Sequence, residues 1–396
     1  MLENGKFRDI VTREGIFTCS PEKNLYNQEV RNPLENSRFA SSLRNFSDGI
    51  ESGMQMTLQS KHSGGRYDFV KMPKTDLHVH LEGTLEPEML FRLAGRNHIP
   101  LPWKTPQELH EAFQFRDLSG FLAIYYKGCE VLVTEQDFYD LTSAYLQRAS
   151  ADGVIHTEFF FNPQIFQRKK TPLHAIMRGV FSAVHDMRDR ISCLYMGTVM
   201  RTRPVEEALQ ALEQLAPWYD QIAAFGMGGA ENGNPPWRFK PYFEACRERG
   251  FRICVHAGEE GPAEYVREAV ELNVDRIDHG NAAILDPRLM QTLAEKRIPL
   301  TMCPISNLRL NVVKNLSEHP LKQMLARGLC VTINSDDPAY FLGYASDNWT
   351  AVQLALGLTS AEIFQLAVNG IEASFLPEER KLRLRNQIKT NMPELV

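Results

Sequence analysis

Short apolar runs alternate with longer amphipathic stretches along the chain from Thr75 onward. Strands that are buried on both faces of a sheet read as such apolar runs, because neither face has to be polar. Eight strands are predicted in this way: Asp76–His80, Val154–Phe161, Ile191–Met200, Gln221–Phe225, Phe251–His256, Arg276–His279, Ile298–Met302 and Leu329–Asn334.

The stretches between these runs carry apolar residues at the spacing of one helix face. Because strand and helix alternate, the strands should pair in parallel. Eight such units in roughly 250 to 300 residues predict an α/β protein of the (β/α)8 TIM barrel type. A long helical insertion is expected after the first strand, at residues 86–152, and two or three extra helices are expected after residue 346. The other predicted helices include Leu173–Arg188, Val205–Ala216, Arg238–Arg249, Ala263–Leu272, Arg288–Lys296 and Leu321–Arg327.

The first 65 residues differ from the rest of the chain. They are rich in Asn, Ser, Gly and charged residues, and show neither the strand period nor the helix period. A segment of this composition buries little apolar surface, so we expect an N-terminal extension at 1–65 that is disordered or loosely docked. A Ser-Gly-Gly sequence at 63–65 marks its end, and residues 66–396 are predicted to form the barrel domain.

Charge and hydropathy bound the class of partner. The 396 residues include 44 Lys and Arg and 49 Asp and Glu, which gives a net charge of −5. This balance provides no bulk attraction to nucleic acid or to a membrane surface, and it favours a small-molecule partner. No apolar run reaches the roughly 18 residues of a membrane span. The first residues lack a secretory pattern, so a cytoplasmic protein is expected. The sequence leaves the oligomeric state open, a homo-oligomer included.

Candidate chemistry gathers where the predicted strands end, which in a barrel is the face that carries the active site. The first strand carries His78 and His80, whose i, i+2 spacing points both imidazoles to one side, as a divalent metal requires. The seven cysteines form no Cys-x-x-Cys pair, so neither a disulfide framework nor a thiolate metal site is expected. Further residues that can bind a metal or transfer a proton end the fifth strand (His256), the sixth (Asp278-His279) and the eighth (Asp336-Asp337).

Five motifs follow one another in order: His-Val-His-Leu-Glu-Gly-Thr, His-Ala-Gly-Glu, Asp-His-Gly, Cys-Pro-Ile-Ser-Asn and Asn-Ser-Asp-Asp-Pro. Over residues 67–370 this set resembles the adenosine/adenine deaminase family of metal-dependent hydrolases. The resemblance implies a barrel of that type and a hydrolase that uses one Zn2+ per chain to deaminate an aminopurine. It implies zinc ligands His78, His80, His256 and Asp336, a proton shuttle Glu259, a hydroxide-orienting and charge-stabilising His279, and an Asp337 that binds a purine nitrogen.

Within this family the likeness is greatest to the adenine-type branch. Glu82 stands where nucleoside enzymes more often have an aspartate that contacts the sugar, and the longer side chain is expected to fill sugar space. Glu231 is expected to narrow the base pocket and to bind substrate. Residues 337–344, followed by Asn348, also resemble the adenine type. The implied reaction converts adenine to hypoxanthine and ammonia, a step of purine salvage.

Two departures from the adenine-type pattern leave other substrates open. Residues 226–230 read Gly-Met-Gly-Gly-Ala where the family usually has a Leu-Asp-Ser type of sequence, and Asn162 replaces an aspartate. Two adjacent glycines can enlarge a pocket. An N6-substituted adenine is therefore an alternative substrate, as is adenosine.

Two further classes compete with a deaminase. A two-metal barrel hydrolase would need a bridging lysine on the fourth strand, and residues 221–226 contain none. A catalytically degenerate barrel that serves as a binding protein ranks lower, because all four implied ligands and Glu259 are present. Ser306 and Asn307 are expected to shape a loop through hydrogen bonds, not to take part in catalysis.

Overall fold

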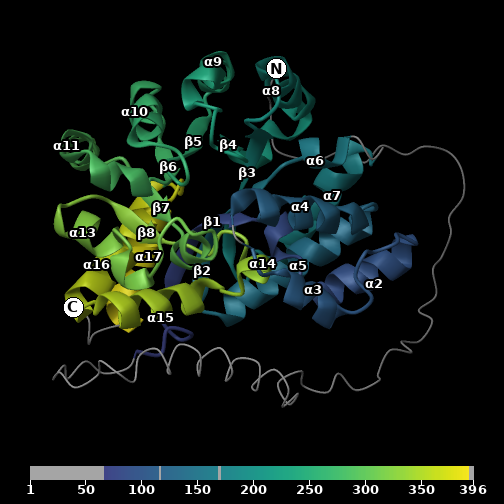
Figure 1. Ribbon diagram of the computed structural model, residues 1–396, viewed down its shortest axis with the longest axis horizontal. Coiled ribbons are helices and arrows are strands. Elements are labelled where there is room, and N and C mark those ends of the chain that lie inside the picture. The colour runs from purple at the N-terminus through teal and green to yellow at the C-terminus, as the bar shows by residue number, and fades with distance from the viewer. Residues whose placement is uncertain (1–66, 116, 168–170, 392–396) are drawn as a thin grey trace, which may run out of the picture. The chain divides into compact units, whose positions relative to one another are not determined.

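A computed structural model describes residues 67–115, 117–167 and 171–391 of the chain. Eight parallel strands pair in sequence order, and helices surround them (Figure 1). A parallel bridge between Val79 and Asp336 joins the two ends of the sheet, so the predicted (β/α)8 barrel is confirmed. The strands are Lys74–His80 (β1), Val154–Phe161 (β2), Ser192–Met200 (β3), Ile222–Gly228 (β4), Arg252–Ala257 (β5), Arg276–His279 (β6), Leu300–Met302 (β7) and Val331–Ile333 (β8).

The predicted insertion after β1 is helical and lies at the right of the barrel in Figure 1. It places the helix α4 beside the mouth of the barrel, where the strands end. The predicted helical insertion covers α3 and α4, although the sequence pattern gave no separate bounds for them. The elements of the insertion are Glu82–Thr84 (η2), Pro87–Asn97 (α2), Pro106–Ala112 (α3), Leu118–Gly128 (α4), Cys129–Val131 (η3) and Glu135–Ala151 (α5).

The remaining helices connect successive strands or follow β8. The predicted helix over 238–249 begins as a 3-10 turn, and the predicted C-terminal helices are present. These elements are Gln164–Gln167 (α6), Leu173–Met187 (α7), Val205–Gln214 (α8), Ala216–Gln221 (η4), Pro236–Phe239 (η5), Lys240–Glu248 (α9), Ala263–Glu271 (α10), Asn281–Leu285 (η6), Pro287–Lys296 (α11), Pro304–Arg309 (α12), Leu316–Glu318 (η7), Leu321–Ala326 (α13), Pro338–Phe341 (α14), Ala345–Leu356 (α15), Ser360–Ala373 (α16) and Glu378–Asn391 (α17).

Local sequence signals fix where several helices begin. Thr134 and Asp137 exchange side chain to backbone hydrogen bonds at the start of α5, which is a capping box. Asp286 accepts hydrogen bonds from the first backbone N–H groups of α11, and the next residue is a proline, which suits the first helical position. Most residues of the barrel strands are buried, and β6 and β8 are buried throughout.

Buried charges fill the barrel toward the amino ends of the strands. Arg276 donates hydrogen bonds to Glu158, at 2.5 Å, and to the carbonyl of Leu77, at 3.0 Å. Its guanidinium lies 4.4 Å from the ring centre of Phe375, which follows α16. The backbone N–H of Phe375 also donates to Glu158. The chain beyond β8 therefore covers the end of the barrel that lies opposite the predicted active site.

Residues Gly65–Val396 form one compact unit. The predicted extension at 1–65 lies outside the described residues. The predicted start of the barrel domain at residue 66 stays a prediction. In the described part of the chain, every helix is too short or too polar to cross a bilayer.

Candidate active site

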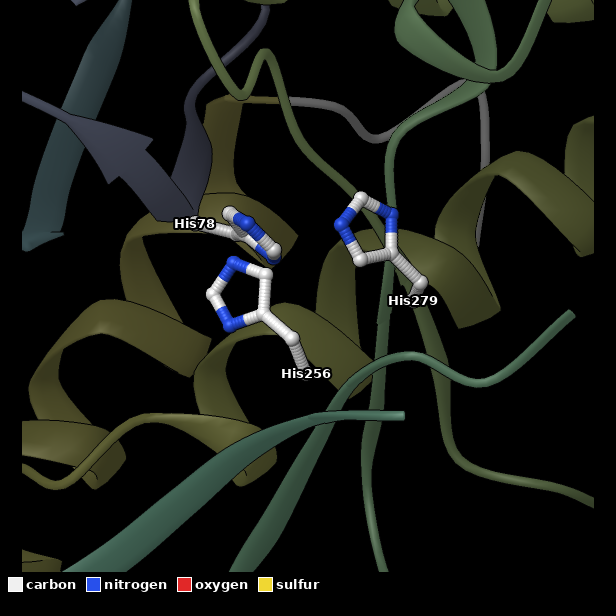
Figure 2. Close-up of side chains that lie close together, drawn as sticks. All are labelled: His78, His256 and His279. Carbon is white, nitrogen blue, oxygen red and sulfur yellow. The ribbon is translucent and has the colours of Figure 1, made fainter. Parts of the chain in front are cut away.

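The four predicted metal ligands meet at the mouth of the barrel. His78 and His80 end β1, His256 lies near the end of β5, and Asp336 follows β8. The Nε2 atoms of His80 and His256 are 3.1 Å apart. Oδ1 of Asp336 lies 3.4 Å from Nε2 of His78 and 3.5 Å from Nε2 of His80. Figure 2 shows the rings of His78 and His256 side by side, with His279 next to them.

These spacings suit a metal ion. A tetrahedral ion with bonds of about 2.0–2.1 Å sets its ligand atoms about 3.3–3.4 Å apart, and the three measured separations lie around this value. Nε2 of His78 is buried and has no hydrogen-bond partner among the described residues. Other donors lie close by, since His279 and Cys303 each fall within 4.8 Å of two of these ligands. The site can therefore hold a metal.

Groups behind the histidines select the tautomers that metal binding needs. Thr301 donates its hydroxyl hydrogen to Asp278, at 2.8 Å, and so can only accept from Nδ1 of His78, at 3.0 Å. Oδ2 of Asp278 lies 3.4 Å from Nδ1 of His256. Because Nδ1 of His78 carries the ring hydrogen, Nε2 of His78 keeps a free lone pair.

Two site residues have a strained backbone. Asp336 and His279 adopt φ values of 66° and 65°, in the left-handed region that costs residues other than glycine about 1–3 kcal/mol. Hydrogen bonds to β1 hold Asp336 in place, because its N–H donates to the carbonyl of His78 and its carbonyl accepts from the N–H of His80, each at 2.9 Å. The barrel thus compensates for a conformation that aims the carboxylate at the histidines.

Glu259 and His279 form a second pair beside the predicted metal ligands. Oε2 of Glu259 lies 3.5 Å from Nε2 of His279, which is 3.9 Å from Oδ2 of Asp336. Burial raises the pKa of Glu259 well above its ordinary value, and the charges of Asp336 and Glu231 raise it further. Burial also lowers the pKa of His279 well below its ordinary value. Glu259 is thereby able to hold a proton near neutral pH while His279 stays neutral.

A cavity opens next to these groups. Its polar wall combines predicted metal ligands with Glu259, and its apolar wall comes from α4 of the insertion. Enclosure by an apolar helix on one side and acid–base groups on the other is typical of a small-molecule site. The lining includes His80, His256, Glu259, Asp336 and Asp337, then Leu118, Phe121, Leu122, Tyr125 and Tyr126 of α4, and also Asn162, Gly228 and Gly229.

The profile of the family described as adenosine deaminase matches residues 73–391. The chain belongs to the adenosine deaminase family. It is 53% identical, over 79% of its own length and 93% of the relative, to a protein named adenine deaminase from Rhodopseudomonas palustris. The crystal structure of adenine deaminase from Arthrobacter aurescens superimposes with a TM-score of 0.79 at 43% identity, covering 81% of this chain and 98% of that one.

An amidohydrolase from Burkholderia ambifaria, whose structure holds bound zinc, superimposes with a TM-score of 0.77 at 27% identity. The alignment covers 86% of this chain and 96% of that one. The comparisons confirm the predicted family and the predicted fold of this family member.

Glu231 lies behind the loop that carries Glu259. Its carboxylate accepts hydrogen bonds from four consecutive backbone N–H groups, those of residues 258 to 261, at 2.6, 2.9, 2.9 and 2.8 Å. Glu231 is not among the residues that line the cavity. In this structure Glu231 therefore positions the loop 258–261, which carries Glu259. The prediction that it contacts substrate stays a prediction.

Glu82 and Asp337 each present a buried oxygen without a hydrogen-bond partner among the described residues. The other oxygen of Glu82 accepts from the backbone N–H of Asn162, at 2.9 Å, and burial raises the pKa of Glu82 to about 7. Asp337 packs against Gly83, where an added Cβ atom would collide with the aspartate carboxylate. Asp337 lines the cavity, whereas Glu82 is not among the lining residues, and the contact of either carboxyl group with substrate stays a prediction.

Sequence reasoning missed several supporting residues. Arg201 donates to the carbonyl of His256, at 2.7 Å, and so fixes the end of β5. Thr301 sits on β7 without any motif to mark it. The expectation that Ser306 and Asn307 shape a loop is wrong, because both lie in the helix α12. Asn307 instead reaches to 3.4 Å from Nδ1 of His279.

Proposed function

We propose that this protein is a zinc-dependent adenine deaminase that hydrolyses adenine to hypoxanthine and ammonia in purine salvage. The observation that carries the proposal is the meeting of four metal-binding side chains with Glu259 and His279 at one wall of a small cavity. Relatives named adenine deaminase that are 46–53% identical over most of the chain support the choice of substrate.

The donor set supports zinc. Three imidazoles and one carboxylate are ligands that zinc accepts, and a position left open to solvent is the mark of a catalytic site. We assign His78, His80, His256 and Asp336 as the ligands. We leave out His279, because its Nε2 atom lies 3.9 Å from the nearer oxygen of Asp336 and faces Glu259 instead.

The roles of the other groups follow from their protonation. Zinc, when bound, supplies the Lewis acidity that makes water a nucleophile near neutral pH. Glu259 holds a proton that it could deliver to the purine ring nitrogen beside the amino-bearing carbon when water adds to that carbon. His279 orients the attacking group. Asp337, whose pKa burial and the charge of Asp336 raise, can donate a hydrogen bond to another ring nitrogen.

An N6-substituted adenine is the second candidate substrate. Gly228 and Gly229 line the cavity, and a Cβ atom added at Gly229 would meet no heavy atom within 4 Å. The φ of 94° at Gly229 also disfavours any other residue. This open corner gives room for a group larger than the adenine amine.

A turnover panel tests the proposal. Zinc-loaded protein is assayed for ammonia release from adenine, adenosine and guanine, and for formation of hypoxanthine and methylamine from N6-methyladenine. Adenine is expected to have the highest kcat/KM. Removal of zinc with a chelator should abolish turnover and re-addition should restore it. Full turnover by metal-free protein would contradict the zinc assignment, and preference for adenosine or N6-methyladenine would replace adenine as the substrate.

A pair of variants tests the role of Glu259. Glu259→Gln removes the proton donor, and Glu260→Gln makes the same chemical change one residue further along the loop. Only the first is expected to abolish ammonia release while zinc content is retained. The predicted cytoplasmic location, the absence of nucleic-acid and membrane partners, and a homo-oligomeric state stay predictions.

A further inference from the structure

We propose that Asn307 sets the ring tautomer of His279, so that the ring hydrogen sits on Nε2 and points to Glu259 and Asp336. The catalytic meaning of this inference rests on the proposed deaminase function. The tautomer itself does not, because the hydrogen-bond chain that fixes it begins at a backbone N–H group outside the active site.

The hydrogen-bond chain starts at the side chain of His319, which is buried between α12 and α13. The backbone N–H of Leu321 lies 3.3 Å from Nδ1 of His319. A peptide N–H can only donate, so this nitrogen of His319 must accept. Burial lowers the pKa of His319 to about 3, and the ring is neutral. Its single hydrogen is therefore on Nε2.

The next link fixes the orientation of the Asn307 side chain. Nε2 of His319 lies 3.1 Å from Oδ1 of Asn307, and Nδ2 of Asn281 lies 2.7 Å from the same atom. If the amide were turned over, its NH2 group would face the N–H of His319, donor against donor. The oxygen of Asn307 must therefore be at this end, although an amide oxygen and nitrogen cannot be told apart by shape alone.

The NH2 group of Asn307 then faces His279. It lies 3.4 Å from Nδ1 of that ring, which is buried. A hydrogen on Nδ1 would again set donor against donor, so Nδ1 must accept and the ring hydrogen must be on Nε2. Figure 2 shows one ring nitrogen of His279 directed toward His78 and His256, and the other directed away.

This tautomer decides what His279 can do. With its hydrogen on Nε2, the ring can donate to an oxygen that gains negative charge during attack, in the manner of an oxyanion-hole donor. It has no lone pair at Nε2 with which to take a proton from water. Proton transfer is then the task of Glu259, whose Oε2 atom lies 3.5 Å away. Asn307 is a positioning residue, since it acts through His279.

Two substitutions of Asn307 separate this role from a purely structural one. Asn307→Asp keeps the shape and still accepts from His319 and Asn281, but its second oxygen accepts from His279 and so favours hydrogen on Nδ1. Asn307→Ala removes all of these contacts yet leaves the Nε2 hydrogen attracted to Glu259 and Asp336. If Asn307 has only a structural role, Asn307→Ala should lose more activity than Asn307→Asp. If Asn307 sets the tautomer of His279, Asn307→Asp should lose more activity.

The direct measurement is nitrogen NMR of the zinc-loaded full chain with 15N-labelled histidine rings. His279 is identified among the 11 histidines by the signal lost in His279→Asn. Nε2 of His279 is expected to show the shift and proton coupling of a protonated nitrogen, and Nδ1 those of an unprotonated one. Asn307→Asp should exchange the two signatures. This NMR measurement needs no substrate, so it tests the tautomer of His279 even if the protein does not turn over adenine.

Kinetics gives the second test. Asn307→Asp is expected to lower kcat about 10²–10³-fold, the loss typical of one oxyanion-hole donor, with KM for adenine changed only a few-fold. Asn307→Ala should lose less. A hydrogen on Nδ1 of His279 in the wild-type protein, or a greater loss in alanine than in aspartate, would overturn the proposal. If neither variant folds, the wild-type NMR spectrum alone decides it.

Discussion

Replacing Glu231 with glutamine tests whether one carboxylate organises the loop that carries the proposed proton donor. Glu231 is buried and accepts from the N–H groups of four consecutive residues, Gly258 to Gly261. Three of these donors share one oxygen, and Gly258 uses the other, at 2.6 Å. Glutamine has nearly the same shape but offers only one acceptor oxygen, so it cannot satisfy all four.

The cost can be estimated from the better of the two orientations of the new side chain. If the glutamine oxygen keeps the three donors of residues 259–261, its NH2 group faces the buried N–H of Gly258. One hydrogen bond to a charged group, worth about 1.5–3 kcal/mol, is lost, and one buried donor is left without a partner at about 1–3 kcal/mol. Glu231→Gln should therefore lose about 2.5–6 kcal/mol of unfolding free energy.

The same change should alter the pH dependence of catalysis. The negative charge of Glu231 is one of the causes, after burial and Asp336, that raise the pKa of Glu259. Removing that charge lowers the pKa of Glu259. Because the proposed donor must hold its proton, kcat/KM falls as pH rises through this pKa. The alkaline limb of the pH profile in Glu231→Gln is thus expected at lower pH than in the wild-type protein.

Two assays measure these effects: urea unfolding of the zinc-loaded protein, and kcat/KM for adenine as a function of pH. Glu260→Gln is the matched control, because Glu260 lies in the same loop but is only half-buried and contributes its backbone to the contact. The control should lose much less unfolding free energy than Glu231→Gln. Equal stability of the two variants, with unchanged alkaline limbs, would refute the role assigned to Glu231.

Three further substitutions probe the metal, the substrate and the proton. Asp278→Asn removes the carboxylate behind His256, and competition with a chelating dye should show zinc bound 10–100-fold more weakly, whereas wild-type affinity would contradict the supporting role. Gly83→Ala drives a Cβ atom into the carboxylate of Asp337, so steady-state kinetics should show a raised KM for adenine with a smaller change in kcat; an unchanged KM would argue against substrate contact by Asp337. Glu259→Gln should lower kcat about 10²–10⁴-fold with zinc content retained, and turnover near the wild-type rate would exclude Glu259 as the proton donor.

The barrel was predictable because its strands are apolar runs that are easily distinguished from the amphipathic helices between them. Both faces of each strand are buried, so the apolar runs stand out from the amphipathic helices, and every predicted strand is present with ends within two or three residues. The helices that escaped prediction lack that contrast. The helix α14 has four residues, too few to show a helical period.

Only the part of the active site that is made of residues with distinctive chemistry was predictable from the sequence. Histidines and acidic residues at strand ends mark the metal ligands, since barrel topology brings those ends together. The residues that orient them are ordinary ones placed by tertiary structure. Glu231 meets its four donors 27 to 30 positions away, and Thr301 meets His78 across 223 positions. Sequence spacing carries no record of such contacts.

Adjacent carboxyl groups at the end of β8 show how the fold gives one residue type two tasks. Burial opposes ionisation of Asp336, but the surrounding histidines, His78 above all, hold its pKa well below the ordinary value. Asp337 is equally buried, packs against Gly83, and has the charge of Asp336 beside it, so its pKa is raised. The φ of 66° at Asp336 turns the backbone between the two side chains. These pKa shifts favour the anion at Asp336, as the proposed metal site requires, and the neutral acid at Asp337, as the proposed hydrogen bond to a purine nitrogen requires.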